Sequence, residues 1–560
     1  MNDMGTGLSI GAATKGWGRT LQLVALLALV FVLLMPSLRA GFIWDDFHQI
    51  VDSPTVGDPE NIPTYFTHNV IQSAGGEGRG APGVDLYRPL FMTSLTAVYA
   101  IDGADPFWFH LAVLVAHLLV CALLWALAVR WLGSPLAAAL GVLFFACHPV
   151  TAEAYLWASA ISEPMAAAGL LGAVLLLDHG CREKDGGWAA AVLAGFVLFA
   201  GLLSKEAVLM ALPAASLYLW RPRGVRLRHL APLWIAAACF LVLRAWALGG
   251  LQAGGAGGGQ RLDALRNYPV LLIDGLRAML GMLPVGIRHL SWEYDHVTWG
   301  LSLAAAAVCL VILGVALALR NKTPLLLLAA LVTGLMLAPI ALVSTIPGWG
   351  GFGRYLYVPL AFLTLALGEM GLTAQRWLRA HRPRLRLAVP LLVAAVLLVE
   401  QVGLRRALWT YANQENLARS AIEIFPDGPD GYEWLGNVYV DRGDLAAALR
   451  YFRAATERGP ELYRPRHNLA AALLYTGHPE EALQQLAIAE SLHGTTSDGS
   501  VIAVTAMMEL GRWDEAATRL LHALEKAPDD PALRALARRF ATEHPRPDEL
   551  PPQLTGRPPS

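Results

Sequence analysis

Residues 107–130 read FWFHLAVLVAHLLVCALLWALAVR, an apolar run whose only Lys or Arg is its last residue, and which contains no Asp or Glu. A run of this length can cross the hydrocarbon core of a bilayer as one α-helix, which needs about 20 predominantly apolar residues. Comparable runs occupy 20–36, 188–203, 229–248, 301–319, 324–343 and 387–404, and shorter ones occupy 135–148, 163–178, 206–220 and 355–373. The pattern predicts an all-α, polytopic membrane domain of about eleven transmembrane helices over residues 1–404.

The composition supports a membrane protein and excludes other classes. Apolar residues make up 55% of the 560, charged residues make up 16%, and the net charge is -1. A disordered chain would be poor in apolar residues and rich in charge. A nucleic-acid partner is not expected, because the chain has no excess of basic residues. Five cysteines in or beside apolar runs are too few for a disulfide framework.

The basic side chains predict the orientation. They concentrate in alternate connectors, namely 1–19, 179–187, 221–229, 320–323 and 374–386. The positive-inside rule places these connectors and the N-terminus in the cytoplasm. An odd number of spans then puts the long loop 37–106 and the C-terminal tail outside. The Ala-, Leu- and Arg-rich composition favours a bacterial inner membrane with a periplasmic tail.

Two segments are expected to be amphipathic helices on the outer face. Residues 268–284 look helical, but Asp274 and Arg277 interrupt their apolar run. Counting this segment as a span would invert everything after it, so an interfacial helix is the preferred interpretation, and spanning stays the alternative. The same interpretation suits residues 89–102.

The C-terminal part carries a repeat of 34 residues. Gly443, Gly477 and Gly511 share this spacing, as do Ala448, Ala482 and Ala516, and also Ala455, Ala489 and Ala523. This period is typical of tetratricopeptide repeats, in which paired helices stack into a solenoid. The pattern predicts about three repeats over 405–540, which bind a partner protein or have a purely structural role. The Pro-rich residues 541–560 are expected to be disordered.

Charged and polar side chains recur on the predicted outer face, where burial near lipid is costly and therefore needs a reason. Asp45 and Asp46 could act as a general base or as metal ligands, or be solvated loop acids. Lys205 and Arg354 suit a lipid phosphate, or they could extend to the interface as helix-end cations often do. Glu153 and Glu163 could contact a sugar or lie at a helix start. No histidine spacing typical of a zinc site occurs, so no metal site is predicted.

Taken in order, these motifs resemble the GT-C glycosyltransferases, in particular the transmembrane and tetratricopeptide-repeat-containing (TMTC-type) O-mannosyltransferases. The matching segments are Trp44-Asp45-Asp46, Tyr87-Arg88-Pro89-Leu90, Phe109-His110 with His117, His148-Pro149-Val150 with Glu153-Ala154, Ser204-Lys205-Glu206 and Arg354-Tyr355-Leu356-Tyr357-Val358-Pro359. The resemblance covers nearly the whole chain.

The resemblance implies an inverting transfer of a sugar, mannose being the first candidate, from a polyprenyl-phosphate donor to a protein hydroxyl at the extracytoplasmic face. Asp45 matches the acid that serves as base and Asp46 matches its partner. Lys205, Arg354 and Arg88 match the residues that hold the donor phosphate. The remaining implied substrate-binding or supporting residues are His148, Glu153, Glu163, Glu206, Tyr355 and Tyr357. Such a donor carries its own leaving group, so no cofactor is required, although a divalent cation could take part.

The chain departs from the family pattern at three places. Ile161 and Glu163 stand where relatives usually carry an Arg and an Asp, Gly353 stands where an acid is usual, and the Gly-rich stretch 249–259 replaces a more structured loop. Two alternatives therefore remain. One keeps the chemistry with a lipid or glycan acceptor. The other is a non-catalytic membrane-anchored scaffold.

Overall fold

The computed structural model describes residues 7–70, 86–180, 187–250, 258–283, 294, 296–343, 345, 352–545 and 554. Within these residues the secondary structure is helical, with no strand. The chain divides into two compact units, 1–416 and 417–560. The division lies beyond the expected domain end at 404, because Ala412 and Gln414 still bond to residues of the first unit.

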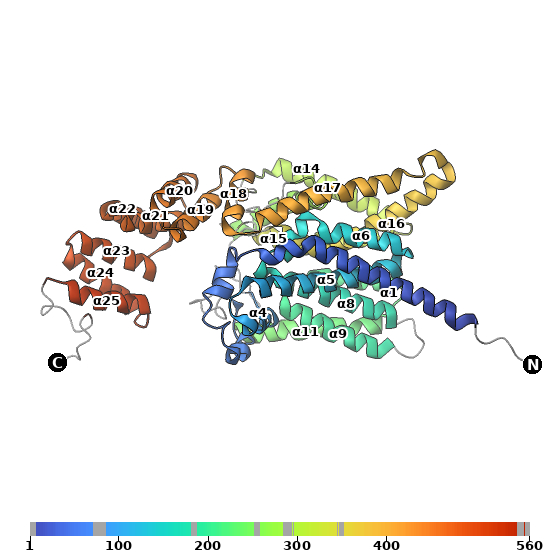
Figure 1. The fold of residues 1–560 in the computed structure, drawn as a ribbon, viewed down its shortest axis with the longest axis horizontal. Coiled ribbons are helices and arrows are strands. Elements are labelled where there is room, and N and C mark those ends of the chain that lie inside the picture. The colour runs from blue at the N-terminus through green and yellow to red at the C-terminus, as the bar shows by residue number, and fades with distance from the viewer. Residues whose placement is uncertain are drawn as a thin grey trace, which may run out of the picture. The chain divides into compact units, whose positions relative to one another are not determined.

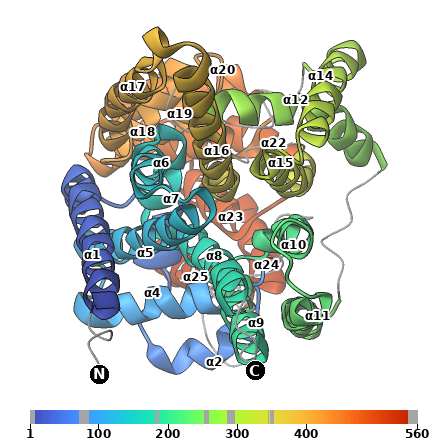
Figure 2. The same ribbon diagram turned by 90° about the vertical axis from the view of Figure 1, so that its right-hand side faces the viewer.

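The first unit is a bundle of long helices (Figures 1 and 2). Each apolar run of the sequence lies in a helix or helix pair. These helices are α1 (Gly7–Leu34), α5 (Pro106–Leu132), α6 (Pro135–Cys147), α8 (Ser162–Gly180), α9 (Gly187–Ser204), α10 (Leu212–Trp220), α11 (Leu227–Leu248), α14 (Trp299–Ala318), α15 (Pro324–Val343), α16 (Tyr357–His381) and α17 (Ala388–Thr410). The all-helical prediction is confirmed.

The number of helices able to cross a membrane is lower than the eleven predicted. Among the described residues, nine helices are long and apolar enough, or ten if α6 and Pro149–Tyr155, bent by 52°, count as one span. The segment Glu206–Trp220 is a separate, shorter apolar helix. At 1.5 Å per residue it reaches only about 22 Å, less than the roughly 30 Å of a hydrocarbon core.

Local sequence signals set the helix ends, as α5 and α6 illustrate. The Asp105 side chain accepts the Phe107 N–H and Pro106 follows it, so α5 begins there. Gly133, with φ +68°, ends α5 in a left-handed conformation that suits glycine. Ser134 then caps α6 by accepting the Ala137 N–H. The two helices therefore form a tight hairpin.

Helix α8 is the most enclosed of the nine described candidate spans, with 78% of its most apolar window buried in the protein. It packs closely on α9, because a Cβ on Gly169 would lie only 2.6 Å from the Gly201 Cα. Small residues at such crossings let helix backbones approach in a membrane. The α8–α9 hairpin places the first residues of α8 beside the residues that follow α9.

Two shorter or less apolar helices match the predicted interfacial segments. Helix α4 (Pro89–Asp102) covers 89–102, and α12 (Gly258–Met279) covers most of 268–284, whose last residue lies outside the described part. Neither is among the span-like helices of the described chain. Helix α12 packs on α15, where the Tyr268 hydroxyl donates to the Gly334 carbonyl at 2.7 Å. The position of α12 relative to a bilayer stays a prediction.

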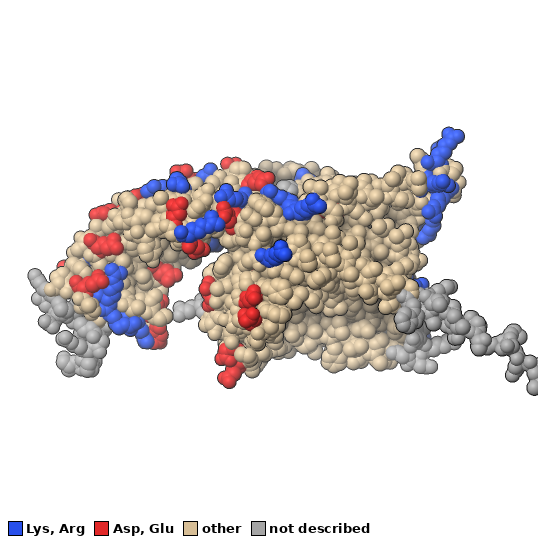
Figure 3. All heavy atoms as spheres, viewed as in Figure 1, with Lys and Arg blue, Asp and Glu red and all other residues tan. Residues whose placement is uncertain are grey.

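Charge is unevenly distributed over the first unit. Figure 3 shows Lys and Arg gathered at the turn between α16 and α17, whereas much of the flank of the helices is uncharged. The exposed arginines of the last turns of α16 and of this connection are Arg376, Arg379, Arg382, Arg384 and Arg386. An uncharged flank with a basic end is the distribution expected of a helix bundle in a bilayer. Which side of the membrane this end faces stays a prediction.

The second unit consists of paired helices that run from α18 (Gln414–Ile424), whose first residues still belong to the first unit, to α25 (Pro531–Glu543). Helices α20 (Leu445–Arg458), α22 (Pro479–His493) and α24 (Trp513–Lys526) begin 34 residues apart. Each is preceded by a glycine turn, in which Gly443, Gly477 and Gly511 have φ of +74°, +77° and +70°. The helix–turn–helix unit thus follows the sequence period. Its identification as tetratricopeptide repeats stays a prediction, and most of the expected disordered segment 541–560 lies outside the described residues.

Candidate functional site

The loop after α1 carries the two candidate acids on an unusual backbone. Trp44, directly before them, has φ +49°, a left-handed conformation that bulky residues rarely adopt. The Trp44 ring stacks on Trp157 at 5.1 Å with 7° between the planes, and the Trp44 backbone N–H donates to the Gln414 Oε1 at 2.8 Å. Such strain persists only where the surroundings fix it, and it clusters at functional sites.

Asp46 is buried and holds this loop to its neighbours. Its carboxylate accepts the Ile43 N–H at 3.0 Å and the Ser159 N–H at 2.7 Å. Burial raises the pKa of Asp46 to about 7, against the lowering effect of these two donors. The geometry therefore gives Asp46 a positioning role for the segment that presents Asp45.

Asp45 is only half-buried and lies within electrostatic reach of Arg354. The Arg354 guanidinium lies over the Trp157 ring, 4.7 Å from its centroid. The Arg354 backbone N–H donates to the Glu153 Oε2 at 3.0 Å, and Glu153 also accepts the Tyr411 hydroxyl. A candidate base and a candidate phosphate-binding cation thus meet at one end of the bundle.

Gly353 is required by the close packing beside Arg354. A Cβ at this position would lie 2.7 Å from the Val150 carbonyl oxygen and 3.3 Å from the Glu153 Oε1. An acidic side chain, which the family pattern has here, would not fit this arrangement. In this chain the Glu153 carboxylate occupies the space next to Arg354 instead.

Lys205 and Glu163 form a buried ion pair across the α8–α9 hairpin. The Lys205 ammonium also lies 4.8 Å from the centroid of the Tyr355 ring. Burial lowers the pKa of Lys205, as do the charges of Arg88 and Arg354, while Glu163 opposes the shift. Lys205 therefore lies close enough to both arginines to interact with their charges.

Arg88 completes the group of cations. It forms a bidentate pair with Glu206, with Nε to Oε2 at 3.0 Å and Nη2 to Oε1 at 2.8 Å. We call the set of Asp45, Arg88, Glu153, Glu163, Lys205, Glu206, Arg354 and Tyr355 the rim cluster. It combines three cations, which suit a phosphate group, with a carboxylate that is partly accessible.

Two predicted site residues lie elsewhere in the packed interior. The His148 ring accepts the Val150 N–H, and its Nε2 lies 3.5 Å from the Glu400 carboxylate of α17. The Tyr357 hydroxyl contacts the His117 Nδ1 at 2.6 Å. Residues two apart at a helix start face nearly opposite directions, so Tyr355 reaches the rim cluster and Tyr357 turns into the bundle.

The structure adds residues that the sequence analysis did not single out. Trp157 carries the stack that orients Trp44 and Arg354. Glu400 is the only charged residue of the apolar run 387–404, and an ionisable side chain within a predicted span is a signal that could have identified it. Among the residues that the structure describes, no three His, Cys, Asp or Glu side chains are grouped so that they could hold a metal ion.

About a third of the sequence of this helical membrane bundle resembles TMTC-type O-mannosyltransferases. Two relatives from Drosophila melanogaster carry the resemblance. The protein O-mannosyl-transferase Tmtc2 is 28% identical over 200 residues, and Tmtc1 is 25% identical over 189 residues. The alignments cover 34% and 33% of this chain and about a fifth (21%) of each relative. No protein-family model matches the chain.

Proposed function

We propose that the chain is an inverting glycosyltransferase that moves mannose from a polyprenyl-phosphate donor to a hydroxyl of a protein. The observation that carries this proposal is the position of Asp45 beside Arg354, within a cluster that also holds Lys205 and Arg88. The names of the two relatives support the sugar and the protein acceptor. The basic end at the α16–α17 turn supports an orientation in which the rim cluster lies on the non-cytoplasmic side of the membrane. We propose that this membrane is a bacterial inner membrane.

In the proposed reaction Asp45 removes the proton of the acceptor hydroxyl as that oxygen attacks the anomeric carbon. An alcohol is too weak an acid to ionise beforehand, and a positioned base contributes about 10²- to 10⁴-fold. The bond from the anomeric carbon to the phosphate oxygen breaks on the opposite face. The negative charge that develops on the phosphate is stabilised by Arg354, Lys205 and Arg88, which are already fixed in place. In this route side chains, and not a metal ion, stabilise the leaving group. We therefore expect EDTA, which removes divalent cations, to leave the activity unchanged.

The experiment that tests the proposal uses the full chain in lipid nanodiscs with labelled polyprenyl-phosphate mannose. Ser- and Thr-containing proteins, lipid extract and free glycans are offered as separate acceptors. We expect label on protein, with the anomeric configuration opposite to that of the donor. Asp45→Asn should lower the rate by at least about 100-fold while apparent Tm is retained.

Three results would contradict this. If the folded protein transfers no label, the scaffold alternative is favoured. If label reaches only lipid or glycan, the acceptor is a lipid or glycan and not a protein. Equal rates for wild type and Asp45→Asn would exclude Asp45 as the catalytic base.

A further inference from the structure

A cavity lies at the opposite end of α8 from the rim cluster. Glu163 of the rim cluster and Asp178 are 15 residues apart on this helix, which corresponds to about 22 Å along its axis. Close to Asp178, helices α10, α14 and α15 enclose a cavity of about 710 Å³. A phosphate bound at this end of α8 would therefore be separate from the donor phosphate proposed at the rim cluster.

The cavity is polar at its mouth and apolar inside. Arg221 follows the last residue of α10, and Arg320 and Asn321 lie in the turn between α14 and α15. Ala214 and Leu331 also line the cavity. Ala214 lies seven residues before Arg221, and Leu331 lies seven residues after Pro324. Seven helical residues correspond to about 10 Å, so the apolar lining extends well below the arginines.

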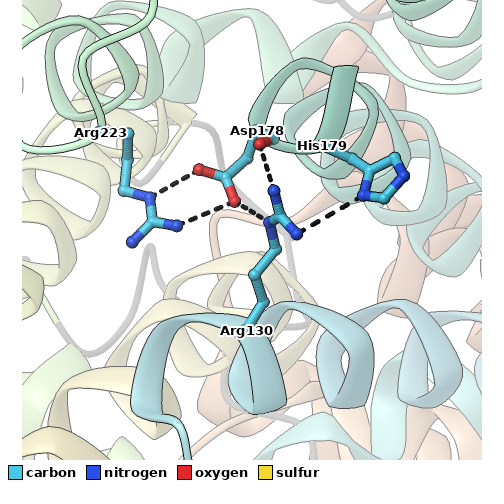
Figure 4. Close-up of polar contacts among 4 residues, drawn as sticks. All are labelled: Arg130, Asp178, His179 and Arg223. Carbon is cyan, nitrogen blue, oxygen red and sulfur yellow. Dashed lines mark hydrogen bonds and ion pairs between the residues drawn. The ribbon is translucent and has the colours of Figure 1, made fainter. Parts of the chain in front are cut away.

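A buried ion cluster holds the Arg221 segment in place (Figure 4). Asp178 accepts from Arg223, with Nε to Oδ1 at 2.6 Å and Nη2 to Oδ2 at 3.0 Å. Arg130 of α5 pairs with the same carboxylate and donates to the Asp178 carbonyl at 2.6 Å. The Arg223 backbone N–H also bonds to the Tyr218 carbonyl at 3.2 Å. These bonds fix the turn that begins at Arg221, which lines the cavity, and the Arg221 guanidinium lies over the Trp220 ring, 3.9 Å from its centroid.

The local charge is positive. Asp178 forms ion pairs with two arginines, Arg130 and Arg223. Arg221 and Arg320, which line the cavity, are two further positive charges. Among the residues that the structure describes, Glu369 of α16 is a second carboxylate near this region, and it accepts the Leu325 N–H at the start of α15. Within this described part, four guanidinium groups thus accompany two carboxylates.

We infer that this cavity binds one anionic phospholipid, with its phosphate at Arg221 and Arg320 and an acyl chain along the leucines of α14 and α15. Guanidinium groups match phosphate oxygens in a bidentate manner. Basic pockets between transmembrane helices are known to bind anionic headgroups. A free anion would leave the apolar interior unused, and a zwitterionic lipid would bring its own cationic group to the arginines. The lipid therefore fits both ends of the cavity.

Native mass spectrometry of the full chain, delipidated and then titrated with phosphatidylglycerol or phosphatidylcholine, tests this inference. We expect wild type to retain one phosphatidylglycerol at concentrations where phosphatidylcholine is lost. The double variant Arg221→Gln/Arg320→Gln should lower that retention at least about fivefold. Leu317→Trp, which fills the apolar part without changing charge, should lower it as well.

The matched control is Arg376→Gln/Arg379→Gln, which removes the same charge from exposed positions of α16. It should leave lipid retention unchanged. Three results would overturn the inference. These are equal retention of both lipids by wild type, an equal loss in the control, and complete displacement of the lipid by millimolar inorganic phosphate. All variants should first show the wild-type elution profile and apparent Tm, so that loss of lipid is not loss of fold.

Discussion

Asp45 and Asp46 are adjacent in the chain but lie in different environments, and their environments separate their roles. Asp45 is partly accessible and faces Arg354, whereas Asp46 is enclosed and accepts two backbone N–H groups. The sequence alone could not distinguish them, because adjacent acids in a loop have no defined directions until Trp44 and Trp157 stack. A base must reach the substrate, so the accessible acid is the candidate.

The raised pKa of Asp46 predicts a pH dependence of stability. Its pKa is about 7 in the folded protein and near its ordinary value of 3.8 when unfolded. The folded state therefore binds the proton more tightly, and the resulting stabilisation is complete below about pH 4 and lost as the pH rises through about 7. We expect apparent Tm in detergent to fall between pH 5 and pH 8.5. In Asp46→Asn this fall should be much smaller, and an unchanged slope would exclude Asp46 as its source.

Arg354 is predicted to act through its shape as well as its charge. Its planar guanidinium stacks on Trp157, and a lysine ammonium cannot reproduce this stack or a bidentate phosphate contact. We expect Arg354→Lys to lower kcat/KM for the donor by about 10- to 100-fold, which corresponds to losing one or two charge-assisted hydrogen bonds. Arg376→Lys, at an exposed position of α16, is the control and should keep wild-type kinetics. Equal kinetics of Arg354→Lys and wild type would contradict a phosphate-binding role.

At the scale of elements, the α8–α9 hairpin is the part that brings Glu163 to Lys205. The sequence predicted that both residues lie on one face, because the positive-inside rule places helix ends on a common side. It could not predict their pairing, which depends on how closely two helices cross. Nor could it predict that His148 turns to Glu400, because a residue just past a helix end takes its direction from the packing around it.

The close approach of α8 and α9 predicts opposite outcomes for two neighbouring glycines. A Cβ on Gly169 would meet the Gly201 backbone at 2.6 Å, so the helices would have to separate, at a cost of about 1–3 kcal/mol. A Cβ on Gly172 would lie 3.2 Å from the Val197 Cγ1, a side-chain atom that can move. We expect Gly169→Ala to lower apparent Tm and to weaken donor binding. Gly172→Ala should change neither, and equal effects would show that the crossing tolerates separation.

At the scale of the whole molecule, hydrophobic runs and the 34-residue spacing were sufficient to predict the helical class and the repeated helix pairs. The number of spans was less accurate, because an apolar stretch such as 206–220 indicates burial without stating whether lipid or protein covers it. Residues Ala412 and Gln414 show the same limit at the boundary between the units. They follow the last apolar run, yet they bond to Gly41 and Trp44 of the first unit.

This boundary determines how the role of the second unit should be tested. A deletion that begins at 412 would remove the acceptor of the Trp44 N–H and disturb the loop that carries Asp45. A deletion of 417–560 retains it, because the first unit ends at Asn416. If the second unit selects protein acceptors, this shorter chain should still transfer mannose to a short Ser/Thr peptide, but it should lose most transfer to folded proteins. Gln414→Ala in the full chain is the complementary variant, and should slow both acceptors together because Trp44 loses a hydrogen bond. Unchanged transfer to folded proteins after the deletion would instead give the second unit a role unrelated to acceptor choice.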